Sequence, residues 1–293
     1  MNSRRDGITG YIAGGLGNQL FILGAAWEQA ERLGCPLYLD ASHFRVEGTR
    51  GFEVDALATP ARTLDPSESW RSLRLNSERV LPFPNRLGRI YLERDADRYA
   101  DTIDQVRPGT TLVGYFQSRR YFPTVAPRLI DAMLAMPETE AESSILARMR
   151  AEPAITLHLR RGDYLAVPTA RQFIASVDYA KRALALTRDL GLDLPVRVFS
   201  DSVDLVRDEL AGVDAQFDFV ADDGSLSIWS TLKAMSEGTA MIMSNSSFSW
   251  WAATLMARRP EKPPVIIGPR PWTSSGTAKA DLLEAGWITL DAR

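Results

Sequence analysis

The sequence predicts an α/β protein with two domains, each a parallel sheet covered by helices on both faces. Three observations lead to this prediction. Short β-prone segments alternate with helical patterns along most of the 293 residues, which is typical of parallel sheets. The length suits two domains of about 150 residues each. Finally, Pro153 ends a helical pattern, so we expect the domains to span residues 1–152 and 153–293.

The first domain begins with a strand, a helix and a second strand. Residues 8–13 are apolar and β-prone, and they run into the glycine-rich turn GGLGN at 14–18. Apolar or small residues then recur at helical spacing from 20 to 30. Gly34 is the expected helix end, before a strand at 36–39. Such a unit pairs its strands in parallel through a right-handed crossover.

The rest of the chain divides unevenly. Residues 52–104 contain several prolines and scattered arginines and predict loops with short helices, without further detail. The later elements are clearer, with a strand at 111–115 and a helix within 127–150. In the second domain we expect strands at 154–160, 196–200, 217–221, 240–244, 265–267 and 287–291, and helices at 178–190, 203–210, 226–237 and 247–257.

Composition excludes several classes of function. The net charge of −3 provides no global basic field for nucleic acid or anionic membranes. One cysteine cannot form an intramolecular disulfide, and with two histidines it makes a zinc site improbable. No apolar run approaches the ~20 residues of a membrane span. We therefore expect a cytoplasmic protein without a structural zinc site.

The sharpest candidate motif is HLRRGDY at residues 158–164, which follows the first strand of the second domain. Ligands of parallel α/β sheets bind at the carboxyl ends of the strands. Two arginines there suit a diphosphate, because guanidinium groups bind oxyanions through paired hydrogen bonds. On a strand, Arg160 and Arg161 point to opposite sides, so one can reach a ligand while its neighbour pairs with an acid such as Asp163. An Arg–Asp pair that merely closes the strand is the alternative.

A second motif, SNSSFSWW at residues 244–251, follows an apolar strand and opens a helix. Asn245, Ser246 and Ser247 are residue types preferred at helix starts. A helix start also presents N–H groups and a positive dipole end to an anion. The aromatic residues are expected to be core. The hydroxyl and amide groups form a candidate phosphate cradle beside Arg160.

The glycine-rich turn of the first domain is a weaker signal. A tight turn between strand and helix explains Gly14, Gly15 and Gly17 without a ligand. The spacing also departs from G-x-G-x-x-G, which disfavours a nicotinamide cofactor.

Taken together, these segments resemble the α-1,2-fucosyltransferases of glycosyltransferase family 11. The similarity covers most of the chain and is weakest at 47–110. It includes the glycine-rich turn with QLF, GYFQS at 114–118, the His-x-Arg-Arg-x-Asp motif, Phe199-Ser200-Asp201, and the serine–tryptophan motif. The resemblance implies a GT-B-type fold of two Rossmann-like domains facing a cleft, an acceptor-side domain first and a GDP-sugar-binding domain second.

The resemblance also implies an activity and its residues. The expected reaction is inverting, metal-independent transfer of L-fucose from GDP-β-L-fucose to the 2-hydroxyl of a terminal galactose in an oligosaccharide. The expected catalytic residues are Arg160, Asp163 and Asn18. The donor-binding residues are expected to be Gly15, Gly17, His158, Arg160, Arg161, Asp201, Asn245, Ser246 and Ser247.

Several alternatives stay open at this point. For the general base, Asp163, Asp40 and His43 are all candidates. The enzyme can instead use another GDP-sugar or acceptor linkage, or the chain can be a nucleotide-sugar-binding protein without catalysis. The resemblance further implies a bacterial cytoplasmic enzyme that acts on soluble or lipid-linked glycans, with or without peripheral attachment to the inner face of the membrane.

Overall fold

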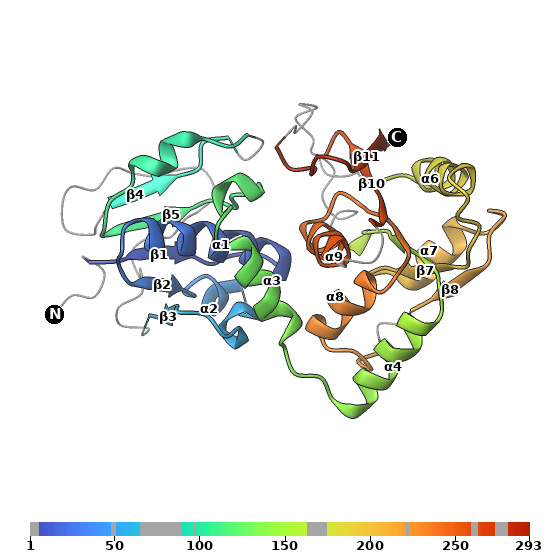
Figure 1. Ribbon diagram of the computed structural model, residues 1–293, viewed down its shortest axis with the longest axis horizontal. Helices are drawn as coiled ribbons and strands as arrows, with labels where there is room; N and C mark the ends of the chain where they lie inside the picture. The colour runs from blue at the N-terminus through green and yellow to red at the C-terminus, as the bar shows by residue number, and fades with distance from the viewer. Residues whose placement is uncertain are drawn as a thin grey trace. The chain divides into compact units, whose positions relative to one another are not determined.

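The computed structural model describes residues 6–47, 51–64, 89–95, 98–162, 175–220, 223–258, 263–272 and 281–293. The chain divides into two compact units, Met1–Ala135 and Met136–Arg293. Each unit contains one parallel sheet with helices packed on it (Figure 1). The predicted fold class, α/β with two Rossmann-like units of the GT-B type, is therefore confirmed.

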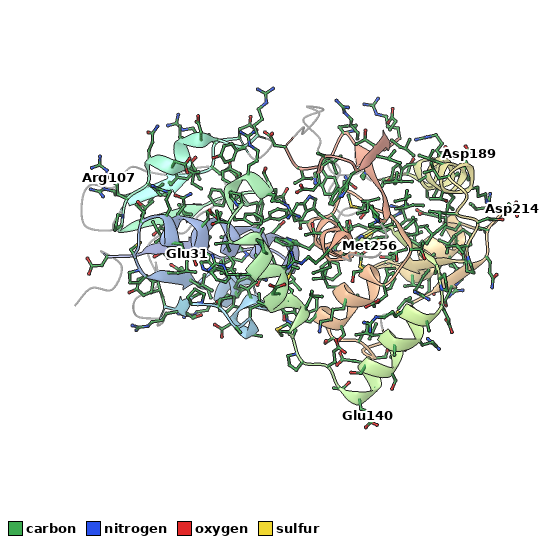
Figure 2. All side chains as sticks on the ribbon, viewed as in Figure 1. Glu31, Arg107, Glu140, Asp189, Asp214 and Met256 are labelled. Atoms are coloured by element: carbon green, nitrogen blue, oxygen red, sulfur yellow. The ribbon has the colours of Figure 1, made fainter. Side chains whose placement is uncertain are left out.

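In the first unit, the described strands follow the order β3-β2-β1-β5-β4, and every neighbouring pair is parallel. Helix α1 packs on β1 and β2, burying the apolar side chains that recur at helical spacing. Glu31 on α1, labelled in Figure 2, pairs with Arg128 of α3 and ties the two helices together. The elements are β1 (Ile8–Tyr11), α1 (Leu16–Arg32), β2 (Leu37–Asp40), α2 (Phe44–Glu47), β3 (Arg62–Thr63), β4 (Arg89–Leu92), β5 (Thr110–Val113) and α3 (Ala126–Leu134), with 3-10 turns at Val54–Ala56, Asp101–Gln105 and Arg119–Tyr121.

In the second unit, the described strands follow the order β11-β10-β9-β6-β7-β8, again parallel throughout. Helix α6 packs on β9, β10 and β11, and α8 packs on α9. Trp250 and Trp251 are fully buried, as expected for core aromatics. The elements are α4 (Glu140–Ala151), β6 (Ile155–His158), α6 (Val177–Asp189), β7 (Val196–Phe199), α7 (Val203–Glu209), β8 (Phe217–Phe219), α8 (Ile228–Ser236), β9 (Ala240–Ile242), α9 (Ser247–Ala257), β10 (Val265–Arg270) and β11 (Ile288–Asp291).

Helix α4 is attached to α8 within the second unit. Glu142 accepts hydrogen bonds from the amides of Thr139 and Ser227, and these bonds lower its pKa to about 2. Arg150 pairs with Glu237 near the other end of α4. The division into compact units therefore precedes α4, whereas the expected domain limit at 152 follows it. As a functional limit, that boundary stays a prediction.

Candidate active site

Each sheet has one position where the strand order reverses, and the loops around it carry the motifs. In the second unit, the chain runs from β6 outward to β7 and β8, and then returns to place β9 on the other side of β6. In the first unit, β1 likewise lies between β2 and β5. A crevice outside the carboxyl ends at such a reversal is the usual ligand site of open α/β sheets. The loops after β6 and β9, and those after β1 and β5, are therefore the candidate site segments.

A buried histidine bridges the reversal point of the second unit. His158 at the end of β6 shares a 2.9 Å hydrogen bond from Nδ1 to the hydroxyl of Ser244, which follows β9. Both residues are buried. Burial, and then the nearby charge of Arg160, lower the pKa of His158 to about 3. The imidazole is consequently neutral throughout the physiological range, which suits a fixed hydrogen-bonding group rather than a proton-transfer residue.

This shift predicts an acid-sensitive stability. Above the ordinary histidine pKa, His158 is neutral in both the folded and the unfolded chain, and its full contribution to the free energy of unfolding is present. Between that value and 3, only the unfolded chain takes up a proton at this position, so stability falls with pH, by about 2 kcal/mol at pH 5. Urea unfolding of the wild type and His158→Gln at pH 7.5 and 5 measures the difference. An identical pH dependence in the two proteins would contradict this prediction.

The two adjacent arginines have different surroundings. Arg160 Nε lies 2.8 Å from Asp201 Oδ2, and both side chains are 25% exposed. Arg161 is 3% exposed and donates from Nε to Glu209 Oε2 at 2.8 Å, and from Nη1 to the carbonyls of Arg160 and Ala175. The structure thus leaves Arg160 accessible and buries Arg161. Strand β6 ends at His158, so the expected strand at 154–160 is too long and strand alternation does not cause this division.

Asp201, which follows β7, organises the backbone around these arginines. Its Oδ1 accepts hydrogen bonds from the amides of Arg161 at 2.8 Å and Gly162 at 3.1 Å, while Oδ2 pairs with Arg160. A Cβ on Gly162 would lie 2.3 Å from Asp201 Oδ2, so only glycine allows this approach. Asp201 therefore supports Arg160 directly, and its expected contact with a nucleotide stays a prediction.

The start of α9 forms the other side of the β6–β9 reversal. Ser246 caps the helix by accepting a hydrogen bond from the amide of Phe248. The side-chain amide of Asn245 bonds to backbone groups of Ala175 and Trp272, which fixes the loop. Ser247, in the first turn, is partly exposed. The first-turn amides of a helix have no partners within the helix, so the arrangement suits an anion.

In the first unit, side-chain hydrogen bonds hold the turn after β1 and join it to the loop after β5. Gly14 has a φ of +74°, a conformation that glycine adopts without strain. Gln19, which is buried, donates to the carbonyl of Gly14 at 2.9 Å. Asn18 Oδ1 accepts a 2.8 Å hydrogen bond from Gln117 Nε2. Gly15 precedes α1 and Gly17 lies buried in its first turn.

The candidates for a general base have different outcomes. Asp163 lies outside the described residues. Asp40 is 1% exposed, and its Oδ1 accepts a hydrogen bond from the amide of Ser42. His43 packs edge-on against the rings of Tyr11 and Phe44. The burial of Asp40 is unsuited to contact with a substrate, so the base stays unassigned.

Two residues that contact predicted site residues were not identified from the sequence. Glu209, at the end of α7, is the acid that pairs with Arg161, although we expected a neighbour such as Asp163. Gln117 lies in the GYFQS motif but had no expected role, and it contacts Asn18 across 99 positions of sequence. For Gln117, the available signal was that its motif and that of Asn18 both follow strands, since loops at adjacent carboxyl ends lie together. No local signal identified Glu209.

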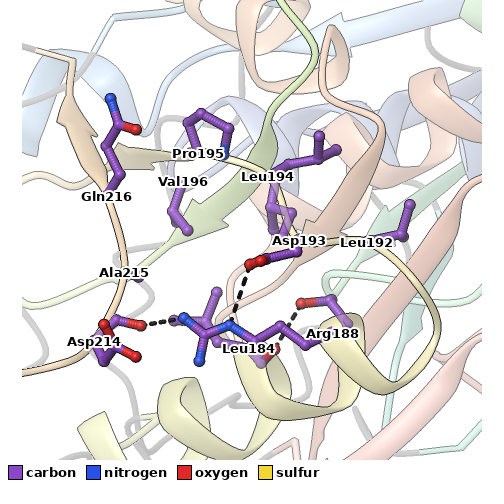
Figure 3. A pocket seen from close by; sticks show the side chains of 12 residues that line it. Leu184, Arg188, Leu192, Asp193, Leu194, Pro195, Val196, Asp214, Ala215 and Gln216 are labelled. Atoms are coloured by element: carbon purple, nitrogen blue, oxygen red, sulfur yellow. Dashed lines mark hydrogen bonds and ion pairs between the residues drawn. The ribbon is translucent and has the colours of Figure 1, made fainter.

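Other features lie away from the site or add no ligand. A cavity of about 550 Å³ lies between Ile155, Arg188 and Gln216 at the amino ends of β6 and β7, the edge opposite the motifs (Figure 3). Within the described ranges, no three His, Cys, Asp or Glu side chains cluster as metal ligands. In the same ranges, no helix combines the length and the apolar composition that crossing a bilayer requires.

Comparison with known proteins identifies the family. The model described as Glycosyl transferase family 11 matches residues 110–290, more than half of the chain. The O-antigen biosynthesis glycosyltransferase WbnK of Escherichia coli is 26% identical over an alignment of 309 positions. The alignment covers 95% of this chain and 99% of that protein. An alpha-1,2-colitosyltransferase of Escherichia coli is 23% identical, with 89% and 90% covered.

A solved structure supports the fold. The fucosyltransferase NodZ from Bradyrhizobium aligns with a TM-score of 0.51 and 16% identity, covering 88% of this chain and 97% of that one. At this identity the likeness concerns the fold alone. Together with the match to the family model, the two parallel α/β units and their motif-bearing loops show that the chain is a glycosyltransferase and belongs to glycosyl transferase family 11.

Proposed function

We propose that this glycosyltransferase moves L-fucose from GDP-β-L-fucose to the 2-hydroxyl of a terminal galactose, with inversion and without a metal. The observation that carries the proposal is the β6–β9 reversal point, where accessible Arg160 and the start of α9 follow adjacent strands. Family membership supports the reaction class. The name of the 1,2-colitosyltransferase supports the linkage, and that of the O-antigen enzyme supports a glycan acceptor.

The second unit supplies groups that suit the leaving nucleotide. Breaking the bond between fucose and phosphate leaves additional negative charge on GDP. Arg160 and the first-turn amides of α9 are donors held in place before the reaction, and stabilisation by such fixed donors is commonly the largest catalytic contribution. Where no divalent cation shares this charge, the guanidinium group has to bear most of it. Arg161 and Asp201 hold the loop that carries Arg160.

The acceptor hydroxyl also has to lose a proton during the reaction. Inversion by direct displacement requires a group that takes the proton of the attacking hydroxyl. Asp163 and His43 stay candidates for that base, and Asn18 keeps its predicted role beside the reacting groups. The proposal also places the enzyme in a bacterial cytoplasm, where soluble or lipid-linked glycans serve as acceptors.

The proposal predicts transfer to lactose and N-acetyllactosamine in the presence of EDTA. The products are analysed by mass and by NMR for linkage, and we expect fucose on position 2 of galactose at an undiminished rate. Loss of activity in EDTA that Mg²⁺ or Mn²⁺ restores would contradict metal independence. GDP binding without any transfer would favour a nucleotide-sugar-binding protein, and absence of both would refute the proposal.

A colitosyl donor is the second candidate, because one relative is named as a colitosyltransferase. Colitose is fucose without its 3-hydroxyl, so a site that hydrogen-bonds this hydroxyl discriminates strongly against colitose. Competition between GDP-fucose and GDP-colitose in one reaction measures the preference directly. A higher kcat/KM for the colitose donor would replace fucose in the proposal and leave the rest of it intact.

A further inference from the structure

The GYFQS motif of the first unit contains a polar contact that the proposed reaction does not yet use. Asn18 follows β1 and Gln117 follows β5, and these strands are hydrogen-bonded neighbours at the reversal point of this sheet. Gln117 Nε2 donates to Asn18 Oδ1 at 2.8 Å. Both side chains are partly exposed. A substrate bound at this edge can therefore reach them.

Both loops are fixed independently of this contact. Gln19 anchors the glycine-rich turn through the carbonyl of Gly14, as described above, and also accepts a 2.9 Å hydrogen bond from the amide of Glu53. On the other side, the carboxylate of Glu93 accepts hydrogen bonds from the amides of Tyr115 and Phe116 at 2.7 and 3.0 Å. The hydrogen bond between Asn18 and Gln117 is therefore not needed to hold either backbone. Its consequence is the orientation of an amide group.

A primary amide has one accepting oxygen and a donating nitrogen. Because Gln117 occupies the oxygen of Asn18, the nitrogen of Asn18 is turned away from Gln117. It lies over the turn, 3.0 Å from where a Cβ on Gly14 would stand. In the part of the chain that the structure describes, Asn18 accepts from Gln117, and its nitrogen donates no hydrogen bond. Asn18 thus offers N–H donors at the carboxyl edge of the sheet.

We infer that Gln117 is a positioning residue that orients Asn18, so that Asn18 Nδ2 donates a hydrogen bond to an oxygen of the substrate. The inference rests on the proposed function and deepens it. The oxygen belongs either to GDP-fucose or to the acceptor sugar, which share the chemistry of a hydrogen-bond acceptor. In both cases, reversing the side-chain amide of Asn18 would place its oxygen against the oxygen of the substrate, and no hydrogen bond could form.

Gln117→Glu tests this inference with little change of shape. A carboxylate cannot donate to Asn18 Oδ1 and instead accepts from Nδ2, which turns the oxygen of Asn18 outward. We expect kcat/KM to fall about 100-fold, within the range for loss of one transition-state donor. Gln117→Met, which only removes the hydrogen bond, should cost about 10-fold. Exposed Gln105 provides the matched control, since Gln105→Glu adds the same charge outside the site.

A double-mutant cycle separates orientation from packing. Asn18→Asp keeps the bond from Gln117 but removes the N–H donor, so its loss should equal that of Gln117→Glu. Because Asn18→Asp has already removed the donor that Gln117 orients, the uncharged change Gln117→Met in the same protein should make the double variant no worse than Asn18→Asp alone. Melting temperatures within a few degrees of the control are also expected. Additive losses, or kcat/KM of Gln117→Glu within threefold of the active wild type, would overturn the inference.

Hydrolysis of GDP-fucose without acceptor distinguishes the two sources of the oxygen. If Asn18 contacts the donor, hydrolysis falls together with transfer in Gln117→Glu. If it contacts the acceptor, hydrolysis is retained and the acceptor KM rises. Both results support the inference. A wild type that transfers nothing would overturn the proposed function and this inference together, whereas an active wild type with unaffected variants overturns this inference alone.

Discussion

Replacing Arg160 with alanine is expected to lower kcat for fucosyl transfer by about 10²–10³-fold, the range seen when one transition-state donor is removed. Arg160 lies at the carboxyl end of β6 and is partly accessible, and Asp201 holds its Nε. A guanidinium group placed there counters the charge that develops on the departing diphosphate. Steady-state rates with GDP-fucose measure the fall in kcat. Calorimetry with GDP measures the weaker binding of the diphosphate that is expected beside it.

Two further variants separate the loss of the guanidinium group at the site from a general effect of charge on folding. Arg148 is exposed on α4 of the same unit, and Arg148→Ala removes an equal charge away from the site. Arg160→Lys keeps the charge but loses the planar fork that pairs with phosphate oxygens, so an intermediate rate is expected. A folded Arg160→Ala protein with kcat within threefold of wild type would exclude a role for this guanidinium group in leaving-group stabilisation.

Replacing Arg161 should affect folding more than chemistry. Arg161→Met is expected to lower the free energy of unfolding by about 3 kcal/mol, because it leaves the buried carbonyl of Ala175, the partly buried carbonyl of Arg160 and the carboxylate of Glu209 without their donor. Urea denaturation of the variant and of Arg148→Met provides the comparison. Glu209→Gln should also destabilise, since it leaves the charge of the 3%-exposed Arg161 without its anionic partner.

Activity provides the second half of this test. Arg161→Lys retains a buried cation near Glu209, so we expect a smaller loss of kcat than in Arg160→Ala. The division of roles between the two arginines would be wrong if folded Arg161→Lys lost as much activity as Arg160→Ala. It would also be wrong if Arg161→Met were as stable as the wild type.

The regular elements were largely predictable because their signals are local. Helix α9 begins and ends where the pattern predicts, and α6 differs by one residue at each end. The helix expected within 127–150 is instead two helices, with Thr139 capping the second. Strands β3 and β4 lie within residues 52–104, where loops with short helices were predicted, so that prediction missed both strands. Both are short edge strands, and such strands carry little periodicity.

The sequence predicted which segments form the candidate site, but not which side chains contact each other within it. Motifs after β1, β5, β6, β7 and β9 indicated the right edges of the two sheets. The pattern did not indicate which arginine is buried, because we derived their divergence from strand alternation and β6 ends before both. Their partners come from the loop after β7 and from the end of α7, with Asp201 40 positions and Glu209 48 positions beyond Arg161.

The sequence by itself determined the alternation of strands and helices, the glycines that the turns require, and the family resemblance that the family model confirms. These depend on periodicity and on residue types within a few positions of each other. Only the tertiary structure decided that Arg161 pairs with Glu209, that His158 shares a buried hydrogen bond with Ser244, and that Gln117 donates a hydrogen bond to Asn18. Such contacts depend on strand order, which brings distant loops to one edge, and no local pattern specifies that order.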